Sequence, residues 1–269
     1  MRKFQKMKLV CVQARLGSSR LPKKVLLEVL GRPLLLHQIE RIERANNVDK
    51  VVVITSTEKK NDLIEEICKE SNIDYFRGSE LDLLDRHYRA AIEYKADFVI
   101  KIPSDCPLVD PKIVQEVVSL WESNKDLYDY VSNYHPPTFP DGLDVEGCSI
   151  EALELAWQRA KKPYEREHTF PYIWDQPDKF KIGNYVNSHG NMFMTHRWTL
   201  DYPEDYQFIK TIFEELKAIP NFGMSDVLEL LKRNPEIADI NRMYLGVNWY
   251  RHHEGALKTV DKAQYKNIP

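Results

Sequence analysis

Apolar runs of strand length alternate with amphipathic, helix-length patterns through the first hundred residues of this 269-residue chain. Strands are expected at 8–13 (KLVCVQ), 51–56 (VVVITS) and 97–103 (DFVIKIP), and helices at 33–45, 62–70 and 81–94. The second and third runs are apolar almost throughout, which is typical of strands covered by helices on both faces of a parallel sheet. The alternation therefore predicts an α/β fold built on a mostly parallel sheet.

The second half of the chain has a different character. Prolines and aromatic residues are dense from Tyr128 to Trp198, and we place an inserted lobe at about 133–197. The segment 192–201 (MFMTHRWTLD) predicts a further strand, and an amphipathic helix is expected after Pro203. The expected organisation is a polar N-terminal extension at 1–7, a main domain at 8–240, and a C-terminal arm at 241–269 to which no role is assigned.

Composition argues against several classes of function. The chain has 38 Lys and Arg against 41 Asp and Glu, a balance that does not suit broad binding to a nucleic acid backbone. No segment approaches the roughly 18 apolar residues of a membrane span, and no secretory leader is recognised. The four cysteines lie far apart and lack metal-ligand spacing. We expect a cytoplasmic protein with reduced thiols and no nucleic acid or membrane partner.

A loop dense in small and cationic residues follows the first expected strand. Its sequence from Gln13 to Lys24 is QARLGSSRLPKK. Small residues let backbone N–H groups approach an anion closely, and the four cations supply charge. The Walker spacing and the GxGxxG motif are both absent, which excludes the commonest nucleotide-binding loops. The segment predicts a phosphate cradle, although taken alone it is equally compatible with a basic surface loop.

Two aspartates are expected at the ligand-binding edge of the sheet. Asp105 follows the apolar run at 97–103, and Asp201 ends the expected strand at 192–201. Open α/β sheets bind ligands at the carboxyl ends of their strands. A pair of carboxylates facing a cationic loop suits a Mg²⁺–nucleoside triphosphate, because Mg²⁺ prefers hard oxygen ligands. The alternative for each aspartate is a helix N-cap.

Three further polar clusters are candidates for substrate contacts. They are Gly78, Asp85 and Arg86 near a helix start, then Asp141, Asp144 and Glu146 after a Pro-Asp-Gly turn, and then Arg166, Glu167 and His168 among aromatic residues. The first cluster could read a base edge, the second needs cations or a hydroxyl-rich ligand if buried, and the third suits an acceptor pocket. The alternatives are a capped helix, a bare turn and an interface helix. The absence of GxSxG, HExxH and SxxK motifs disfavours covalent catalysis.

Six segments carry, in this order, a resemblance to a known family. They are QARLGSSRLPKKVL, FRGSELDLLDRH, SDCPLVDP, PPTFPDGLDVE, EREHTFPYI and RWTLDYPEDY. Together they closely resemble the spore-coat-polysaccharide branch of the cytidylyltransferases, relatives of the enzymes that activate sialic acid with CTP. The resemblance covers about residues 8–233. It implies a glycosyltransferase-A-like α/β sandwich with a small embedded acceptor or dimerisation lobe.

The resemblance also implies roles for individual residues. CTP would be bound by Gln13, Ala14, Arg15, Gly17, Ser18, Ser19, Arg20, Lys24, Gly78, Asp85 and Arg86, and Mg²⁺ by Asp105 and Asp201. The acceptor would contact Asp144, Glu146, Arg166 and His168. The catalytic residues would be Arg15, Lys24 and Asp105. The family often has glycine where this chain has Lys23 and Ser104, so a stiffer and more cationic phosphate loop is expected.

The activity expected from this resemblance is the Mg²⁺-dependent transfer of CMP from CTP to a sugar acid, with release of pyrophosphate. The product would serve the synthesis of a cell-surface polysaccharide. A phosphorylated acceptor giving a CDP-linked product, a nucleotide-sugar glycosyltransferase and a catalytically idle nucleotide-binding subunit are the alternatives. The resemblance and the aromatic-rich segment at 164–174 also favour a homodimer.

Overall fold

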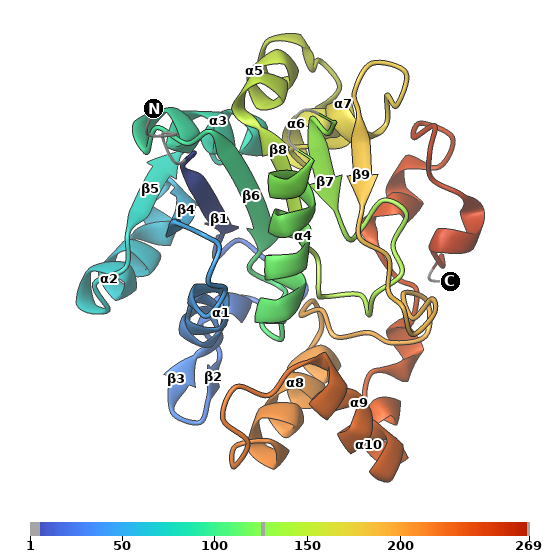
Figure 1. Cartoon of the computed structure of the whole chain (residues 1–269). Helices are drawn as coiled ribbons and strands as arrows, with labels where there is room; N and C mark the ends of the chain where they lie inside the picture. The colour runs from blue at the N-terminus through green and yellow to red at the C-terminus, as the bar shows by residue number, and fades with distance from the viewer. Residues whose placement is uncertain (1–5, 125–126, 268–269) are drawn as a thin grey trace.

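The computed structural model describes residues 6–124 and 127–267. In this part of the chain, seven strands form the central sheet in the order β5-β4-β1-β6-β8-β7-β9 (Figure 1). Their bounds are β1 (Lys8–Gln13), β4 (Lys50–Ser56), β5 (Tyr75–Gly78), β6 (Phe98–Pro103), β7 (Tyr130–Ser132), β8 (Glu146–Ser149) and β9 (Ile182–Asn184). β5, β4, β1 and β6 are parallel, and β9 is parallel to β7. Only β8 runs antiparallel to its neighbours among these strands, so the sheet is mostly parallel.

Helices pack on both faces of this sheet (Figure 1). They are α1 (Leu34–Glu43), α2 (Asp62–Glu70), α3 (Leu83–Glu93), α4 (Pro111–Ser123), α5 (Ile150–Arg159), α6 (Pro163–Glu167), α7 (Pro171–Trp174), α8 (Pro203–Glu215), α9 (Met224–Arg233) and α10 (Pro235–Asp239). Short 3-10 turns occur at Lys24–Leu26, Lys59–Asn61, Arg242–Tyr244, Trp249–His253 and Lys262–Gln264, and a small hairpin pairs β2 (Glu28–Val29) with β3 (Arg32–Pro33).

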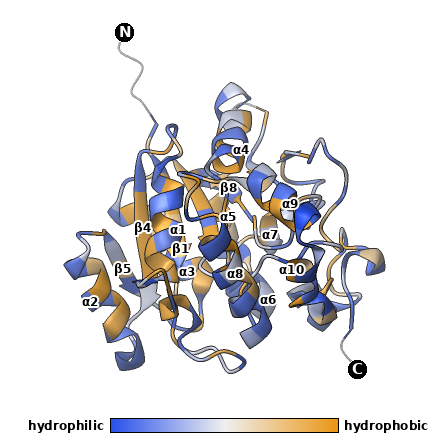
Figure 2. Cartoon of the chain, turned by 90° about the horizontal axis from the view of Figure 1, so that it is seen from below, coloured by the Kyte–Doolittle hydropathy of each residue, from blue (hydrophilic) through white to orange (hydrophobic). Residues whose placement is uncertain are grey.

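The alternation of side chains along β1 explains why both faces are covered. Val10 and Val12 belong to the buried cluster that includes residues of α1 and α4, whereas Leu9 and Cys11 belong to the cluster that includes residues of α3 and α5. Successive residues of a strand point to opposite faces, so an apolar run needs an apolar layer on each side. Figure 2 shows this pattern in β4, which is largely hydrophobic along its length.

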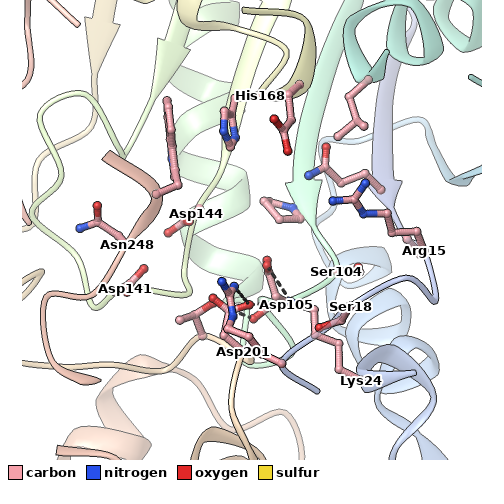
Figure 3. A pocket seen from close by; sticks show the side chains of 18 of the residues that line it. Arg15, Ser18, Lys24, Ser104, Asp105, Asp141, Asp144, His168, Asp201 and Asn248 are labelled. Atoms are coloured by element: carbon pink, nitrogen blue, oxygen red, sulfur yellow. Dashed lines mark hydrogen bonds and ion pairs between the residues drawn. The ribbon is translucent and has the colours of Figure 1, made fainter. Parts of the chain in front are cut away.

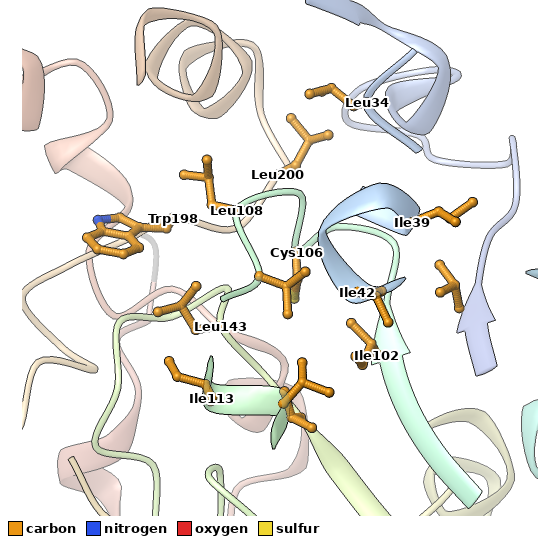
Figure 4. Close-up of a cluster of buried hydrophobic side chains, with 14 of the residues drawn as sticks. Leu34, Ile39, Ile42, Ile102, Cys106, Leu108, Ile113, Leu143, Trp198 and Leu200 are labelled. Atoms are coloured by element: carbon orange, nitrogen blue, oxygen red, sulfur yellow. The ribbon is translucent and has the colours of Figure 1, made fainter. Parts of the chain in front are cut away.

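The first of these clusters continues past the strand ends to the edge of the sheet. Figure 4 shows Ile102 of β6 beside Ile42 of α1, with Cys106 and Leu108 following the strand. Cys106 is fully buried, so the residue next to Asp105 is anchored in the core. Apolar packing therefore fixes the loop that presents the Asp105 carboxylate.

The first half of the chain confirms the predicted elements. β1, β4 and β6 occupy the segments expected as strands, and α1, α2 and α3 occupy those expected as helices. The four cysteines are buried and free, and no helix among the described residues is long and apolar enough to cross a membrane.

The strand predicted at 192–201 is wrong. This segment forms only an isolated bridge between Arg197 and Asp141. Its backbone hydrogen bonds go to loops, because Trp198 N–H donates to the Asp141 carbonyl at 2.6 Å and Leu200 N–H donates to the Asp105 carbonyl at 2.8 Å. The alternating sequence reflects an extended segment that lies across two loop ends, with no neighbouring strand to pair with.

The segment expected as an embedded lobe, at about 133–197, contributes two strands to the central sheet. It contributes β8, which pairs with β6, and β9, which pairs with β7. The remainder of the segment carries α5, α6 and α7. The C-terminal residues after 241 pack back onto this part of the molecule, where Tyr250 and Leu257 share a buried cluster with Trp174 of α7.

Candidate active site

A cavity of about 540 Å³ opens at the carboxyl edge of the parallel strands (Figure 3). This volume is typical of small-molecule sites. One side, which we call the loop wall, is formed by residues 13–24 after β1. The opposite side, which we call the acidic wall, is formed by Asp141, Asp144, Glu146, His168 and the segment 247–252. Asp105 and Asp201 lie between the two walls in Figure 3.

The loop wall is anchored at its start and free along its middle. Ala14 N–H donates to the Ile54 carbonyl at 3.1 Å, and Leu16 N–H donates to Oδ1 of the buried Asn61 at 2.8 Å. Within the described residues, the backbone N–H groups at 17–19 donate no hydrogen bond. The Arg15 side chain is exposed and forms no ion pair in this part of the chain. The loop therefore presents unused donors and an unpaired cation to the cavity, as an anion site requires.

Lys24 links the loop wall to the two aspartates. Its Nζ lies 3.2 Å from Oδ2 of Asp105 and 2.9 Å from Oδ1 of Asp201, and it donates to the Leu200 carbonyl at 2.8 Å. Arg20 reaches the same Asp201 oxygen at 3.0 Å. Burial opposes the charge of Asp201, but Lys24 and Arg20 hold the pKa of this carboxyl below its usual range. Asp105 and Asp201 thus share one cation already, and together they form a cation-binding position.

The buried carboxylates of the acidic wall are neutralised unequally. Asp141 lies 3.5 Å from Nη1 of the buried Arg197. Glu146 lies 2.6 Å from Nζ of Lys101, accepts a hydrogen bond from Tyr130 at 2.7 Å, and lies 3.3 Å from His135. Burial opposes the charge of Glu146, but Lys101 and His135 keep its pKa below the usual range. Both carboxylates therefore have a buried cationic or donor partner.

Asp144 lacks such a partner within the described residues. Its Oδ1 accepts one long hydrogen bond, from Gly142 N–H at 3.3 Å, and no cation pairs with it. Burial, followed by the charges of Asp141 and Asp105, raises the pKa of Asp144 well above its usual value. Burial also raises the pKa of Asp141 to about 7, against the attraction of Arg197. Asp144 is half-buried, and a carboxylate shielded in this way without a partner is costly, so Asp144 is available to a ligand.

Most of the residues predicted for the site meet at this cavity. They are Gln13, Ala14, Arg15, Gly17, Ser18, Ser19, Arg20, Lys24, Arg86, Asp105, Asp144, Glu146, His168 and Asp201. Three predicted residues do not line it: Gly78, Asp85 and Arg166.

These three residues contact side chains around α3, next to the lining of the cavity. Asp85 accepts a hydrogen bond from the Trp157 indole at 2.7 Å. Arg166 donates to Asp82, the N-cap of α3, at 2.9 Å. A side chain at Gly78 would lie 3.1 Å from the Arg86 side chain, so the glycine leaves room for Arg86. The structure therefore places the three around α3, outside the lining of this cavity, and their predicted roles stay predictions.

Two residues at this site were not predicted from the sequence: Trp249 lines the cavity, and Arg197 is buried behind its lining. Arg197 holds Asp205 through two hydrogen bonds of 2.8 Å and lies beside Asp141 and Asp201. Trp249, from the arm to which no role was assigned, stacks on His168 with 3.8 Å between ring centroids. The aromatic and cationic run VNWYRHH at 247–253 was the available signal, but its contacts are distant in sequence.

Comparisons with known proteins agree with this geometry. Residues 9–230 match the family model for cytidylyltransferases. A solved cytidylyltransferase from Leptospira borgpetersenii is 34% identical with a TM-score of 0.83, covering 87% of this chain and 97% of that one.

Two curated relatives extend the comparison. The Bacillus subtilis spore coat polysaccharide biosynthesis protein SpsF is 29% identical, over 86% of this chain and 96% of its own. A 3-deoxy-manno-octulosonate cytidylyltransferase from Trichlorobacter lovleyi is 30% identical, over 78% of this chain and 85% of its own. The chain therefore belongs to the cytidylyltransferase family, in the branch of the spore coat polysaccharide protein, and is a nucleotidyltransferase.

Proposed function

We propose that this enzyme transfers CMP from CTP to a sugar acid and releases pyrophosphate. The observation that carries the proposal is the opposition of two features across one cavity. The loop wall offers free N–H groups at 17–19 and the unpaired Arg15 to a polyphosphate. Asp105 and Asp201 face it as a pair of carboxylates that already share a cation. We choose cytidine as the nucleoside because of the family match. We choose a sugar acid as the acceptor class because of the 3-deoxy-manno-octulosonate cytidylyltransferase relatives.

The residues present fit a Mg²⁺ ion. Mg²⁺ commonly takes one or two protein carboxylates and completes its shell with water and substrate phosphates. Asp105 and Asp201 are such a pair. Within residues 6–124 and 127–267, no group of three or more His, Cys, Asp or Glu side chains could hold a metal alone, so phosphate oxygens would complete the site. Bound there, Mg²⁺ would stabilise negative charge that develops on the phosphates.

The chain's own residues bind and orient the substrates. Arg15, Arg20 and the amides at 17–19 hold the triphosphate, and Lys24 moves from the carboxylates toward it. An acceptor oxygen then attacks the α-phosphorus in line. A bond forms between that oxygen and the phosphorus, and the bond to the bridging oxygen of the β-phosphate breaks as pyrophosphate leaves. Positioning and charge neutralisation carry such a reaction without a covalent intermediate.

Asp144 faces the acceptor in this proposal. Its carboxylate has no cation partner among the described residues, so it can accept a hydrogen bond from an acceptor hydroxyl. Burial raises the pKa of Asp144, so its ionised carboxylate is a stronger proton acceptor than that of an ordinary aspartate. The expected homodimer and cytoplasmic location stay predictions of the sequence.

The test is pyrophosphate release with matched substrate panels. The protein is incubated with Mg²⁺ and each of CTP, UTP, ATP and GTP, against 3-deoxy-manno-octulosonate, N-acetylneuraminate and a set of sugar phosphates. We expect pyrophosphate with CTP and a sugar acid. Release of a nucleoside diphosphate from a nucleotide sugar would instead indicate a glycosyltransferase. Tight CTP binding with no pyrophosphate from any pair would indicate a nucleotide-binding subunit without this activity.

A further inference from the structure

The segment 247–252 is a fixed part of the acidic wall. At its start, Nη1 of the buried Arg197 donates to the Val247 carbonyl at 2.8 Å. Beyond its end, Oδ1 of Asp175 accepts hydrogen bonds from the N–H groups of Lys258 and Thr259 at 2.7 and 2.8 Å. The segment is therefore clamped on both sides of the residues that line the cavity.

Its interior is equally well held. Asn248 Oδ1 accepts from Tyr250 N–H at 3.0 Å, and Asn248 Nδ2 donates to the Gln264 carbonyl at 2.7 Å. Tyr250 is 1% exposed, and its hydroxyl lies 3.2 Å from Nδ1 of His135. A segment fixed in this way can present its remaining side chains at defined positions, which is what a selective binding surface requires.

Trp249 supplies an aromatic surface to the cavity. Its ring stacks on His168 with an interplanar angle of 19°. Burial lowers the pKa of His168 to about 3, so the stacked pair is uncharged at neutral pH. Neutral aromatic faces pack well against the C–H face of a sugar ring, whereas the hydroxyls of such a ring need acceptors such as the Asp144 carboxylate.

Arg251 supplies an unused cation to the same wall. Its Nη1 is shielded from solvent and has no hydrogen-bond partner in the described part of the chain, and its Nε lies 3.2 Å from Nε2 of His252. A buried guanidinium N–H without an acceptor is costly, and a carboxylate would satisfy it with a charge-assisted hydrogen bond. The segment approaches from the side opposite Arg15 and Lys24, as the neighbouring Asn248 shows in Figure 3.

We infer that Trp249 and Arg251 select the acceptor: Trp249 packs on its ring and Arg251 binds its carboxylate. This inference rests on the proposed function and deepens it. Both residues lie outside residues 9–230, the region that matches the family model, so the inference rests on the contacts of this chain's own C-terminal segment.

The test removes each partner of the proposed ion pair in turn. The methyl ester of the acceptor lacks the carboxylate charge, and Arg251→Gln lacks the guanidinium. KM is measured for N-acetylneuraminate or 3-deoxy-manno-octulosonate, whichever the wild type uses, and for its methyl ester. We expect the ester to raise the wild-type KM about 10- to 100-fold, the range of one charge-assisted hydrogen bond. Arg251→Gln should raise KM for the acid by a similar factor and should discriminate less than about threefold between acid and ester.

Trp249 is tested by the same measurement. Trp249→Leu should raise the acceptor KM about tenfold, and Trp249→Tyr, which keeps an aromatic face, should recover most of it. CTP affinity, measured by calorimetry, should stay within about twofold in all variants. Arg233→Gln, on an exposed part of α9, is the matched control and should change neither constant.

The outcomes separate this inference from the proposed function. Arg251→Gln that keeps the discrimination between acid and ester, or that loses CTP affinity instead, overturns the assignment of Arg251 while the activity stands. Trp249→Leu with an unchanged acceptor KM overturns the assignment of Trp249. A wild-type protein that releases no pyrophosphate with either acid contradicts the proposed function and this inference with it.

Discussion

The two walls of the cavity hold charge in opposite ways. The loop wall carries Arg15 and Arg20 at the surface, where Arg15 is unpaired in the described structure and Arg20 pairs with Asp201, whereas Lys24 is largely shielded between Asp105 and Asp201. The acidic wall buries Asp141 and Glu146 together with their partners, whereas Asp144 is half-buried and has no cation partner among the described residues. An exposed cation costs little stability while it waits for a polyphosphate, whereas a partly buried carboxylate without a partner costs more.

The two walls are also held in position by different kinds of contact. The loop wall is continuous in sequence and takes its position from β1, through the hydrogen bond from Ala14 to β4. The acidic wall combines a turn before β8, the end of α6 and the segment 247–252, which are joined only by tertiary contacts. Substitutions in the loop wall should therefore change ligand binding with little effect on folding, whereas those in the acidic wall should change both.

The largest effect is expected where the two walls meet. Asp105→Asn or Asp201→Asn should lower kcat at least about 100-fold, because each removes one of the two carboxylates available to Mg²⁺. Steady-state pyrophosphate release across a Mg²⁺ series checks this. Asp239→Asn, on the exposed end of α10, serves as the control. Near wild-type turnover in both variants would remove the metal assignment and with it the contrast between the walls.

The two walls also differ in how much of each could be predicted from the sequence. Asp105 could be placed at the ligand edge because it directly follows β6, an apolar run that needs burial on both faces. The phosphate loop could be recognised because its residues are contiguous after β1.

The acidic wall was less predictable because its geometry depends on distant pairs. The sequence predicts Arg197 within a strand, whereas in the structure its guanidinium reaches Asp205, Asp141 and the Val247 carbonyl. The position of Trp249 depends on His168 of another segment, and no local pattern encodes that stacking. The resemblance assigned Arg166 to the acceptor, whereas the ion pair with Asp82 turns it toward α3.

A second prediction concerns Lys24, which occupies the space between the two aspartates. Lys24→Met should weaken catalysis about tenfold or more through lost phosphate contacts, and should tighten Mn²⁺ binding in the absence of CTP about tenfold. The reason for the second change is that an ammonium within about 3 Å of both carboxylates repels a divalent cation. Electron paramagnetic resonance of free Mn²⁺ gives this affinity. The control is Lys23→Met, at an exposed neighbouring cation, which should leave the Mn²⁺ affinity unchanged. Equal Mn²⁺ affinities in Lys24→Met and wild type would contradict the prediction.

A third prediction tests the cost of the unpaired carboxylate. The folded-state pKa of Asp144 is raised, so its contribution to stability is greatest below about pH 4 and falls as pH rises. Asp144→Asn should therefore raise Tm at pH 8 by about 2–4 °C and raise it less at pH 5, where a smaller part of the stabilisation has been lost. The same variant should raise the acceptor KM, since stability and function trade off at such a site. Thermal scans from pH 5 to 8 check the first part; a lower Tm at pH 8 would mean that Asp144 has a stabilising partner.

The smallest effect is expected at Lys23, where the resemblance predicted glycine. The backbone of Lys23 has φ 55°, in the left-handed region that costs a residue with a Cβ about 1–2 kcal/mol. Glycine avoids that strain but loses roughly 0.5–1 kcal/mol in backbone entropy. Lys23→Gly should therefore raise Tm by about 1–2 °C with kcat unchanged. Lys232→Gly, inside α9, should lower Tm instead. A fall in kcat for Lys23→Gly would mean that this exposed cation contributes to triphosphate binding. Lys23 would then join Arg15, Arg20 and Lys24 as a cation of the loop wall that acts on the triphosphate.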